Sequence, residues 1–231
     1  MTRTLADHPE IVAGFSQAAD GTMSLNGKFD NRKQYLRAHG LDPKSVVHAG
    51  LCHGVRTAIV TSAAAGQVID NTDGLITAEA NLGLAMTAAD CLLISIFDPR
   101  QQVIGLVHAG SKGLARDAVA QFIKTWLVAF PAKPADMIID ISPSICPEHY
   151  TVSINEAKHF APWPDACQKR QTLMHLDLRR IAVCQLTASG VKPGSITVSP
   201  RCTFENHDLF SYRRDHPPTP QLQVGYLMRQ F

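Results

Sequence analysis

The sequence predicts an α/β or α+β sandwich whose sheets pair mainly antiparallel. Three observations predict this fold class: short β-rich runs outnumber helical patterns, turn residues bound those runs, and the connections between neighbouring runs are too short for a crossover helix. A chain of 231 residues that is 45% hydrophobic and 18% charged can bury one continuous core. We therefore expect a single domain over residues 1–231.

The expected strands are runs rich in aliphatic and β-branched residues that turn residues bound on both sides. In chain order they are Thr57–Thr61, Leu92–Phe97, Val103–Val107, Met137–Ile141, Tyr150–Ile154 and Ser195–Ser199. Because the strands outnumber the helices, we expect the sheets to form the framework of the fold.

Three segments have the periodicity of helices. Between Lys112 and Pro131, apolar residues recur three and four positions apart, so we expect a helix that the proline ends. A second helix is expected over Asp177–Ala188 and a third over Asn31–His39, each followed by a glycine that suits a helix end.

Charge and composition exclude several classes of protein. The formal net charge of +2 gives no strong field for binding nucleic acid or an anionic membrane. No apolar run approaches the roughly 20 residues of a membrane helix, and the first residues lack the apolar stretch of a signal peptide, so a cytoplasmic protein is expected. The cysteines are too sparse for a disulfide scaffold and are expected to be reduced: Cys52, Cys91, Cys146, Cys167, Cys184 and Cys202.

The segment Thr87–Gly113 carries the most chemical information. Two apolar strands flank residues 98–101, whose sequence Asp-Pro-Arg-Gln suits a type I turn. If the first and last residues of that turn face each other, Cys91 lies directly opposite His108, with Cβ atoms about 4.5 to 5.5 Å apart. A sulfur and a ring nitrogen at that distance can share one metal ion or one proton. A buried thiol and a satisfied histidine at a strand end would explain the same two residues.

Two neighbours of this pair bear on its chemistry. Ala109–Gly113 is a small-residue loop that opens a helix, and a helix N-terminus beside Lys112 is suited to bind an anion. Asp90 precedes the thiol at the start of a strand. Its carboxylate can act as an acid or base, or it can cap the strand.

These segments resemble those of a known family. Residues 87–92 resemble the T-A-D-C-x-P segment, and residues 107–113 the H-A-G-W-R-G segment, of the YfiH-like, or laccase-domain, family. Further matches follow in order along the chain: Gly14–Ser16, Ser24–Asn26, Asn31-Arg32, His53-Gly54, Asp73–Thr77, Pro143–Ile145, Tyr150–Val152, Cys202-Thr203 and Phe210–Asp215. The resemblance implies a layered α/β/β/α sandwich with mainly antiparallel or mixed sheets.

The resemblance also implies a metal held by His53, Cys91 and His108. Two imidazoles and one thiolate suit zinc, and three protein ligands leave a fourth position for water or substrate. Copper is less favoured, because multicopper chemistry needs histidines in paired H-x-H arrangements and none of the ten histidines forms one.

Members of this family are similar to purine nucleoside phosphorylases that also deaminate adenosine, and older naming calls them polyphenol oxidases. The implied partners are therefore a nucleoside and phosphate, with no nucleic acid or membrane, and a monomer or homodimer is expected. Zinc can supply hydroxide for attack on the purine, with Asp90 moving protons. Lys112, Arg213 and Arg214 are candidates for a phosphate pocket, although a solvated basic surface would explain them too.

Several positions depart from the family pattern. Leu51 replaces a glutamine, Ser111-Lys112 replaces Trp-Arg, Cys146 stands where a glycine is expected, and Glu205 stands where a further cysteine often occurs. Lysine cannot give an oxyanion the two-pronged contact that arginine gives. A divergent member can keep its zinc and act on another substrate, such as a cell-wall precursor.

Two rival functions stay open. One is a metal-free Cys-His hydrolase or deamidase, with Cys91 as nucleophile and His108 as base, for which His53 would be superfluous. The other is a non-enzymatic protein that uses the metal structurally. Cys52 is expected to be a structural thiol, and no second metal site is expected from Cys202 and His207, because they lack an evident fourth partner.

Overall fold

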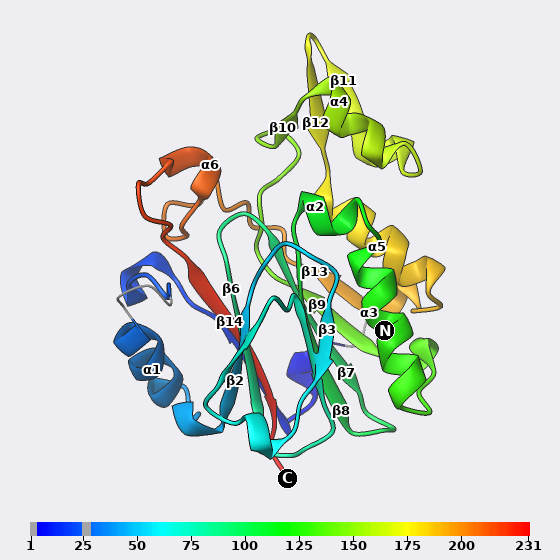
Figure 1. The fold of residues 1–231 in the computed structure, drawn as a ribbon. Helices are drawn as coiled ribbons and strands as arrows, with labels where there is room; N and C mark the ends of the chain where they lie inside the picture. The colour runs from blue at the N-terminus through cyan, green and yellow to red at the C-terminus, as the bar shows by residue number, and fades with distance from the viewer. Residues whose placement is uncertain (1–3, 25–28) are drawn as a thin grey trace.

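Two large β-sheets lie face to face, and helices cover their outer faces (Figure 1). The structure is a computed structural model and describes residues 4–24 and 29–231. One outer layer is helix α1 (Phe29–Ala38), and the other is formed by α3 (Ala118–Ala129) and α5 (Leu178–Ala188). The α/β/β/α layering expected for the fold class is confirmed. Of the matched segment Ser24–Asn26, the last two residues lie outside the described part.

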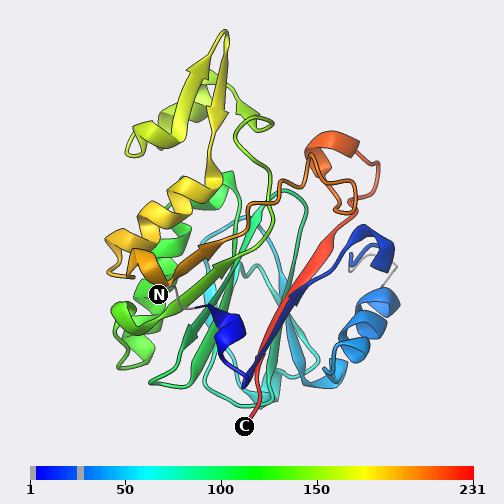
Figure 2. The same ribbon diagram turned by 180° about the vertical axis from the view of Figure 1, so that it is seen from behind.

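The first sheet has five strands, and Figure 2 shows its β1 and β14 running side by side. In spatial order its strands are β1 (Ile11–Phe15), β14 (Gln223–Arg229), β6 (Gly83–Ala88), β2 (Val46–Gly50) and β4 (Val68–Asp70). The first three pair antiparallel, and β2 pairs parallel with both of its neighbours.

The second sheet has six strands and carries the hairpin predicted from the sequence. In spatial order they are β13 (Ile196–Val198), β9 (Ile138–Ile141), β7 (Leu92–Asp98), β8 (Val103–Ala109), β5 (Gly74–Thr77) and β3 (Thr57–Ile59). Its centre is antiparallel, whereas the pairs at both edges are parallel. The sheets are therefore mixed.

A small three-stranded sheet projects beyond the sandwich, at the top of Figure 1. It contains β10 (Thr151–Val152), β12 (Leu173–Leu176) and β11 (Cys167–Arg170), with the one-turn helix α4 (Ile154–Ala157) beside it. Short 3₁₀ turns occur at Leu5–Asp7, Ala18–Asp20, Pro43–Ser45, Ser62–Ala64, Pro134–Asp136, Lys158–Phe160, Pro164–Ala166 and Pro193–Ser195.

Alternation along the strands explains why the layers stack. On β7, Ile94 and Ile96 pack with α3 and α5, while Leu93 and Phe97 point into the space between the two sheets. On β14, Leu227 faces that same space, whereas its neighbours face α1. Because successive residues of a strand point to opposite faces, an apolar strand in a middle layer serves two cores at once.

The long helix expected between Lys112 and Pro131 is interrupted. The chain instead forms one turn, α2 (Ser111–Leu114), and then α3, because Asp117 has a φ of 57° that a continuous helix cannot contain. The prediction of one helix was wrong at this point. The expected helices near α1 and α5 are confirmed within two residues, and the one-turn α6 (Tyr212–Asp215) was not expected.

The hairpin register also differs from the prediction. Leu93 faces His108, and Asp98 faces Val103, so the loop contains four residues and Cys91 lies just before β7 begins. The predicted opposition of Cys91 and His108 was therefore wrong by two residues. A shift of two residues leaves every side chain on its original face, so the thiol and the imidazole still lie on the same side of the hairpin.

Within the described ranges, no helix is long and apolar enough to cross a membrane.

Gly105 on β8 tests the packing between the second sheet and α3. A Cβ atom there would lie 2.5 Å from Cζ3 of Trp126 and 2.7 Å from Cζ of Phe122. We expect Gly105→Ala to lower the free energy of unfolding by about 1 to 3 kcal/mol, because neither ring can move without disturbing the core. Chemical denaturation measures this, and Gly194→Ala is the control, since nothing lies within 4 Å of its added Cβ. Equal stability of the two variants would contradict the packing described.

Candidate metal centre

Three side chains from distant parts of the chain converge where β8 leads into α2. His53 comes from the loop between β2 and β3, Cys91 from the residue before β7, and His108 from β8. One ligand atom from each lies within 4.8 Å of the others, and the two imidazole rings meet edge to face with centroids 5.0 Å apart. The structure brings together all three residues that the sequence proposed as metal ligands.

The backbone is shaped closely around these side chains. His53 and Asp90 have φ values of 57° and 80°, in the left-handed region that non-glycine residues rarely adopt. Strained backbone of this kind is typical of functional sites. At Gly110, an added Cβ would lie 2.7 Å from Sγ of Cys91, so the glycine leaves the room that the sulfur occupies.

Asp73 holds two of the three ligands in place. Its carboxylate is 1% exposed. One oxygen accepts hydrogen bonds from the backbone N–H of His53 (2.9 Å) and from Nδ1 of His108 (3.0 Å). The other accepts from the N–H of Gly54 (2.7 Å) and from the thiol of Cys52 (3.0 Å). Both the His53 loop and the His108 ring therefore take their orientation from one carboxylate.

These bonds set the charge of Asp73. Burial alone would raise the pKa of its carboxyl, but the hydrogen bonds from His108, Cys52 and Gly54 outweigh burial and hold that pKa well below its usual range. The carboxylate in turn raises the pKa of the Cys52 thiol, to which it is hydrogen-bonded. Cys52 therefore stays a protonated donor to Asp73, in keeping with the structural role expected for it.

Cys91 and His108 form a polar pair. Burial opposes charge on both, yet their mutual attraction lowers the pKa of the thiol and raises the pKa of the imidazole, and the hydrogen bond from His108 to Asp73 acts in the same direction. The protein thus favours the thiolate form of Cys91. A thiolate is the form of cysteine that binds metals and attacks electrophiles.

The arrangement fits a zinc ion. With Nδ1 of His108 bonded to Asp73, Nε2 is the nitrogen available to a metal, and a carboxylate behind a metal-binding histidine is a common supporting contact. His108 is buried, whereas His53 is exposed, so the site opens on the His53 side. Asp73 was not among the predicted site residues. Its segment was matched to the family, but nothing in the sequence indicates that a residue 35 positions before His108 contacts it.

A cleft of about 1390 Å³ lies above the three ligands. Its walls include Asp90, Lys112 and Arg213, which the sequence proposed, and the aromatic side chains of Tyr150 and Tyr212, which it did not. Two cationic side chains and two aromatic rings beside the three proposed ligands make a surface suited to an anionic or aromatic small molecule.

The two proposed arginines differ in position. Arg213 lines the cleft, where its guanidinium donates to the carbonyl of Thr151 (3.0 Å) and lies 4.9 Å from the ring centroid of Tyr150. Arg214 donates instead to the backbone carbonyls of Thr203 and Leu209, each at 2.8 Å, and is not among the residues that line the cleft. Its contacts are those of a residue that ties loops together.

Asp90 is buried and has partners for both carboxylate oxygens. One accepts from the hydroxyl of Thr203 (2.6 Å), and the other from the backbone N–H of Arg213 (2.7 Å). The carboxylate therefore joins the start of β7 to α6 and fixes the backbone of Arg213 at the cleft wall. The anion site predicted at the helix after His108 rests on Lys112 alone, because α2 is only one turn long.

A family model, several relatives and a solved structure are similar to this chain over most of its length. The family model described as "Multi-copper polyphenol oxidoreductase laccase" matches residues 28–225. A protein of Mycobacterium tuberculosis named purine nucleoside phosphorylase is 34% identical over 190 residues, which cover 81% of this chain and 74% of that protein. Purine nucleoside phosphorylase YlmD of Bacillus subtilis is 29% identical over 99% of this chain and 92% of its own. The crystal structure of YlmD from Geobacillus stearothermophilus superimposes with a TM-score of 0.91 at 26% identity, over 96% of this chain and 93% of that one.

Asp73→Asn tests the role assigned to the buried carboxylate. We expect zinc affinity to fall about 10- to 100-fold, because His108 and the His53 loop lose their common acceptor. We also expect the free energy of unfolding to fall by about 3 kcal/mol at neutral pH. Because folding depresses the pKa of Asp73, this difference should be complete above about pH 5 and shrink as the pH falls toward the folded pKa.

Zinc titration and denaturation at several pH values measure these effects. Asp136→Asn is the matched control, since Asp136 pairs at the surface with Arg100, which is 73% exposed. Wild-type zinc affinity in Asp73→Asn, or a stability difference that grows toward acid pH, would contradict the role.

Proposed function

Because the chain belongs to the family described as multi-copper polyphenol oxidoreductase laccase, whose relatives include proteins named purine nucleoside phosphorylase, we propose that it is a zinc-dependent purine nucleoside phosphorylase that also deaminates adenosine. One observation carries the proposal. His53, Cys91 and His108 converge in a cleft whose walls also hold cations and aromatic rings. A nucleoside and phosphate offer the matching groups, an aromatic base and an anion.

Zinc is the metal that this donor set favours, since two imidazoles and one thiolate are typical zinc ligands. Bound there, zinc supplies Lewis acidity and lowers the pKa of water in its open position. The chain supplies the rest. The lowered pKa of Cys91 favours the thiolate that binds a metal, and Asp73 holds Nδ1 of His108 so that the ring keeps one orientation.

Phosphorolysis replaces the bond between the base and C1′ of the sugar with a bond from C1′ to a phosphate oxygen, and the base leaves. Lys112 and Arg213 are the cations placed to bind and orient the phosphate. Tyr150 and Tyr212 present rings against which a purine can stack. Tyr150 is itself held by a hydrogen bond from its hydroxyl to Ser111 (2.8 Å).

Deamination of adenosine adds water at C6 of the purine and releases ammonia, which gives inosine. This reaction needs a group that moves protons, and Asp90 is our candidate. Its carboxylate also holds the backbone of Arg213, so it serves as a positioning residue as well. The pH profile of Asp90→Asn separates the roles, because a lost acid or base removes one limb of the profile, whereas a lost positioning contact lowers the whole curve.

One observation favours a second function. Asp73, His108 and Cys91 form a hydrogen-bonded series of carboxylate, imidazole and thiolate, which is the arrangement of a metal-free cysteine hydrolase or deamidase. In that mechanism Cys91 attacks the substrate and His108 moves the proton. His53 distinguishes the two functions, since a nucleophile and its base do not require a third ligand.

Metal analysis with activity assays decides between these functions. We expect the purified protein to bind zinc, to be protected from alkylation at Cys91, and to cleave adenosine, inosine or methylthioadenosine only with phosphate.

Cys91→Ser should lose the metal, and its kcat/KM should fall at least about 100-fold, because one of three ligands is gone. His53→Ala should do the same only if a metal is required. Cys184→Ser, which removes a thiol outside the site, is the control. An active, zinc-free protein whose Cys91 is readily alkylated would establish the hydrolase instead.

Lys112→Gln separates the phosphate site from the metal. We expect the KM for inorganic phosphate in phosphorolysis to rise about tenfold, which is about 1.4 kcal/mol, because one charged contact is lost. Deamination uses no phosphate and should be unchanged. Lys124→Gln on the exposed face of α3 is the matched control. A phosphate KM that stays at the wild-type value would remove Lys112 from the proposed site.

A further inference from the structure

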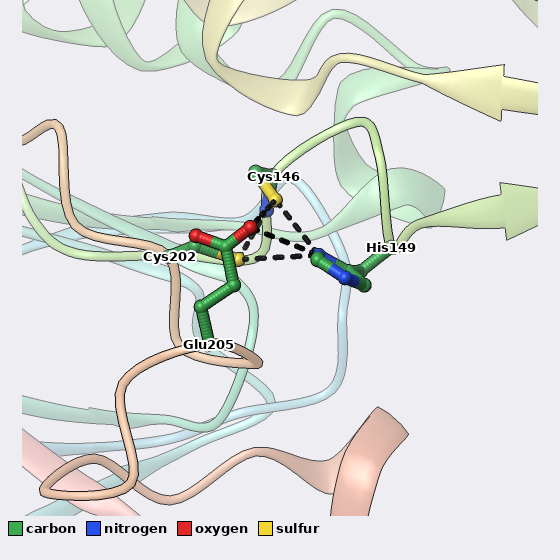
Figure 3. A group of neighbouring side chains, drawn as sticks. All are labelled: Cys146, His149, Cys202 and Glu205. Carbon is green, nitrogen blue, oxygen red and sulfur yellow. Dashed lines mark hydrogen bonds and ion pairs between the residues drawn. The ribbon is translucent and has the colours of Figure 1, made fainter.

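A second group of side chains of the types that bind metals lies together, and none of them is among the residues that line the cleft (Figure 3). Cys146 and His149 come from the segment between β9 and β10, and Cys202 and Glu205 come from the segment between β13 and α6. We propose that these four residues bind a structural zinc ion that joins the two segments. His207 is the partner considered for Cys202 from the sequence, whereas the structure places Cys202 with Cys146, His149 and Glu205.

The distances between the four ligand atoms are close to those around one tetrahedral ion. Zinc bonds of about 2.0 to 2.3 Å place two ligand atoms about 3.3 to 3.8 Å apart in a tetrahedron. Nδ1 of His149 lies 3.1 Å from Sγ of Cys146, 3.5 Å from Oε1 of Glu205 and 3.9 Å from Sγ of Cys202. Sγ of Cys146 lies 3.8 Å from Oε1 of Glu205. All four ligand atoms lie within 4.8 Å of one another.

Hydrogen bonds and an ion pair join these four side chains, but they cannot all form at once. Nδ1 of His149 faces a carboxylate and two thiols at once. A ring nitrogen can either donate one hydrogen bond or accept one, so it cannot satisfy all three partners. A single dication would serve all four groups together. Two thiolates, one imidazole and one carboxylate form a closed zinc set, unlike the three-ligand set of His53, Cys91 and His108.

Burial and supporting contacts also suit a structural ion. Both cysteines are buried, whereas the side chain of His149 is 30% exposed and that of Glu205 is 55% exposed, so an ion can enter from solvent. The backbone N–H of Cys146 donates to Sγ of Cys202 (3.2 Å), a contact that stabilises a thiolate. The His149 ring stacks on Phe204 with centroids 4.3 Å apart, which fixes its orientation.

The place of this group gives the ion a role. Tyr150, which lines the cleft, follows His149 directly, and Thr203, which bonds to Asp90, follows Cys202. An isolated bridge between Ser144 and Cys202 already joins the two segments. A zinc ion would cross-link them and so hold one wall of the cleft. This inference goes beyond the proposed function and does not require it.

Zinc content of variants tests the proposal. In protein purified without chelators, elemental analysis should find about two zinc ions per chain in the wild type and in the thiol control Cys184→Ser. Cys202→Ser and His149→Ala should each retain about one, and Cys91→Ser combined with His149→Ala should retain about none. His149 is partly exposed, so its variant can be tested even if Cys202→Ser fails to fold. In the Cys91→Ser background, bound cobalt(II) should still show thiolate-to-cobalt charge-transfer absorption.

Two results would overturn the second site. In one, the wild type contains about one zinc ion per chain, Cys91→Ser loses it and His149→Ala retains it. That result would rule out the second site and support the first. The other is a disulfide between Cys146 and Cys202, found by peptide mass spectrometry in place of bound metal. The opposite loss, in which His149→Ala removes the single ion and Cys91→Ser does not, supports the second site and contradicts the zinc centre of the proposed function.

Discussion

The carboxylate of Asp73 is the contact on which the proposed metal centre depends. It lies immediately before β5, is almost fully buried, and accepts hydrogen bonds both from the His53 loop and from the His108 ring. A buried carboxylate is costly unless donors surround it, so these groups must stay where they are for the charge to remain stable. The same requirement orients two of the three proposed ligands, which links the stability of the fold to the geometry of the site.

The sandwich brings the remaining groups to this point. The hairpin of β7 and β8, with the residue before it, contributes Cys91 and His108 from one face. The predicted register was wrong by two residues, but this error does not change the face, because every second side chain of a strand points to the same side. Asp90, at the start of the hairpin, then reaches Thr203 and the backbone of Arg213, which come from the last part of the chain. The cleft thus joins segments from the beginning, middle and end of the sequence.

The two proposed zinc sites differ in the way that catalytic and structural zinc sites differ. The first offers three side chains that line the cleft, whereas the second offers four, none of which is among the residues that line it. An open position lets a substrate approach, and a closed set mainly holds chain segments together. Cys146 and Glu205, two of the four ligands in the second group, are positions where this sequence departs from the family pattern.

The sequence by itself determined the layered sandwich class and the existence of the hairpin, though not its register, and it singled out the three residues proposed as ligands, because hydrophobic alternation and turn residues are local signals and the matched segments each span a few residues. It did not predict β1, β2, β4, β5, β6, β11, β12 and β14, nor the break before α3. Asp73 beneath His108, Tyr150 at the cleft wall, and the meeting of Cys146 with Cys202 were decided by the tertiary structure. The partners in those contacts lie 35 to 56 residues apart, and only the pairing of strands and the packing of layers bring such distant residues together.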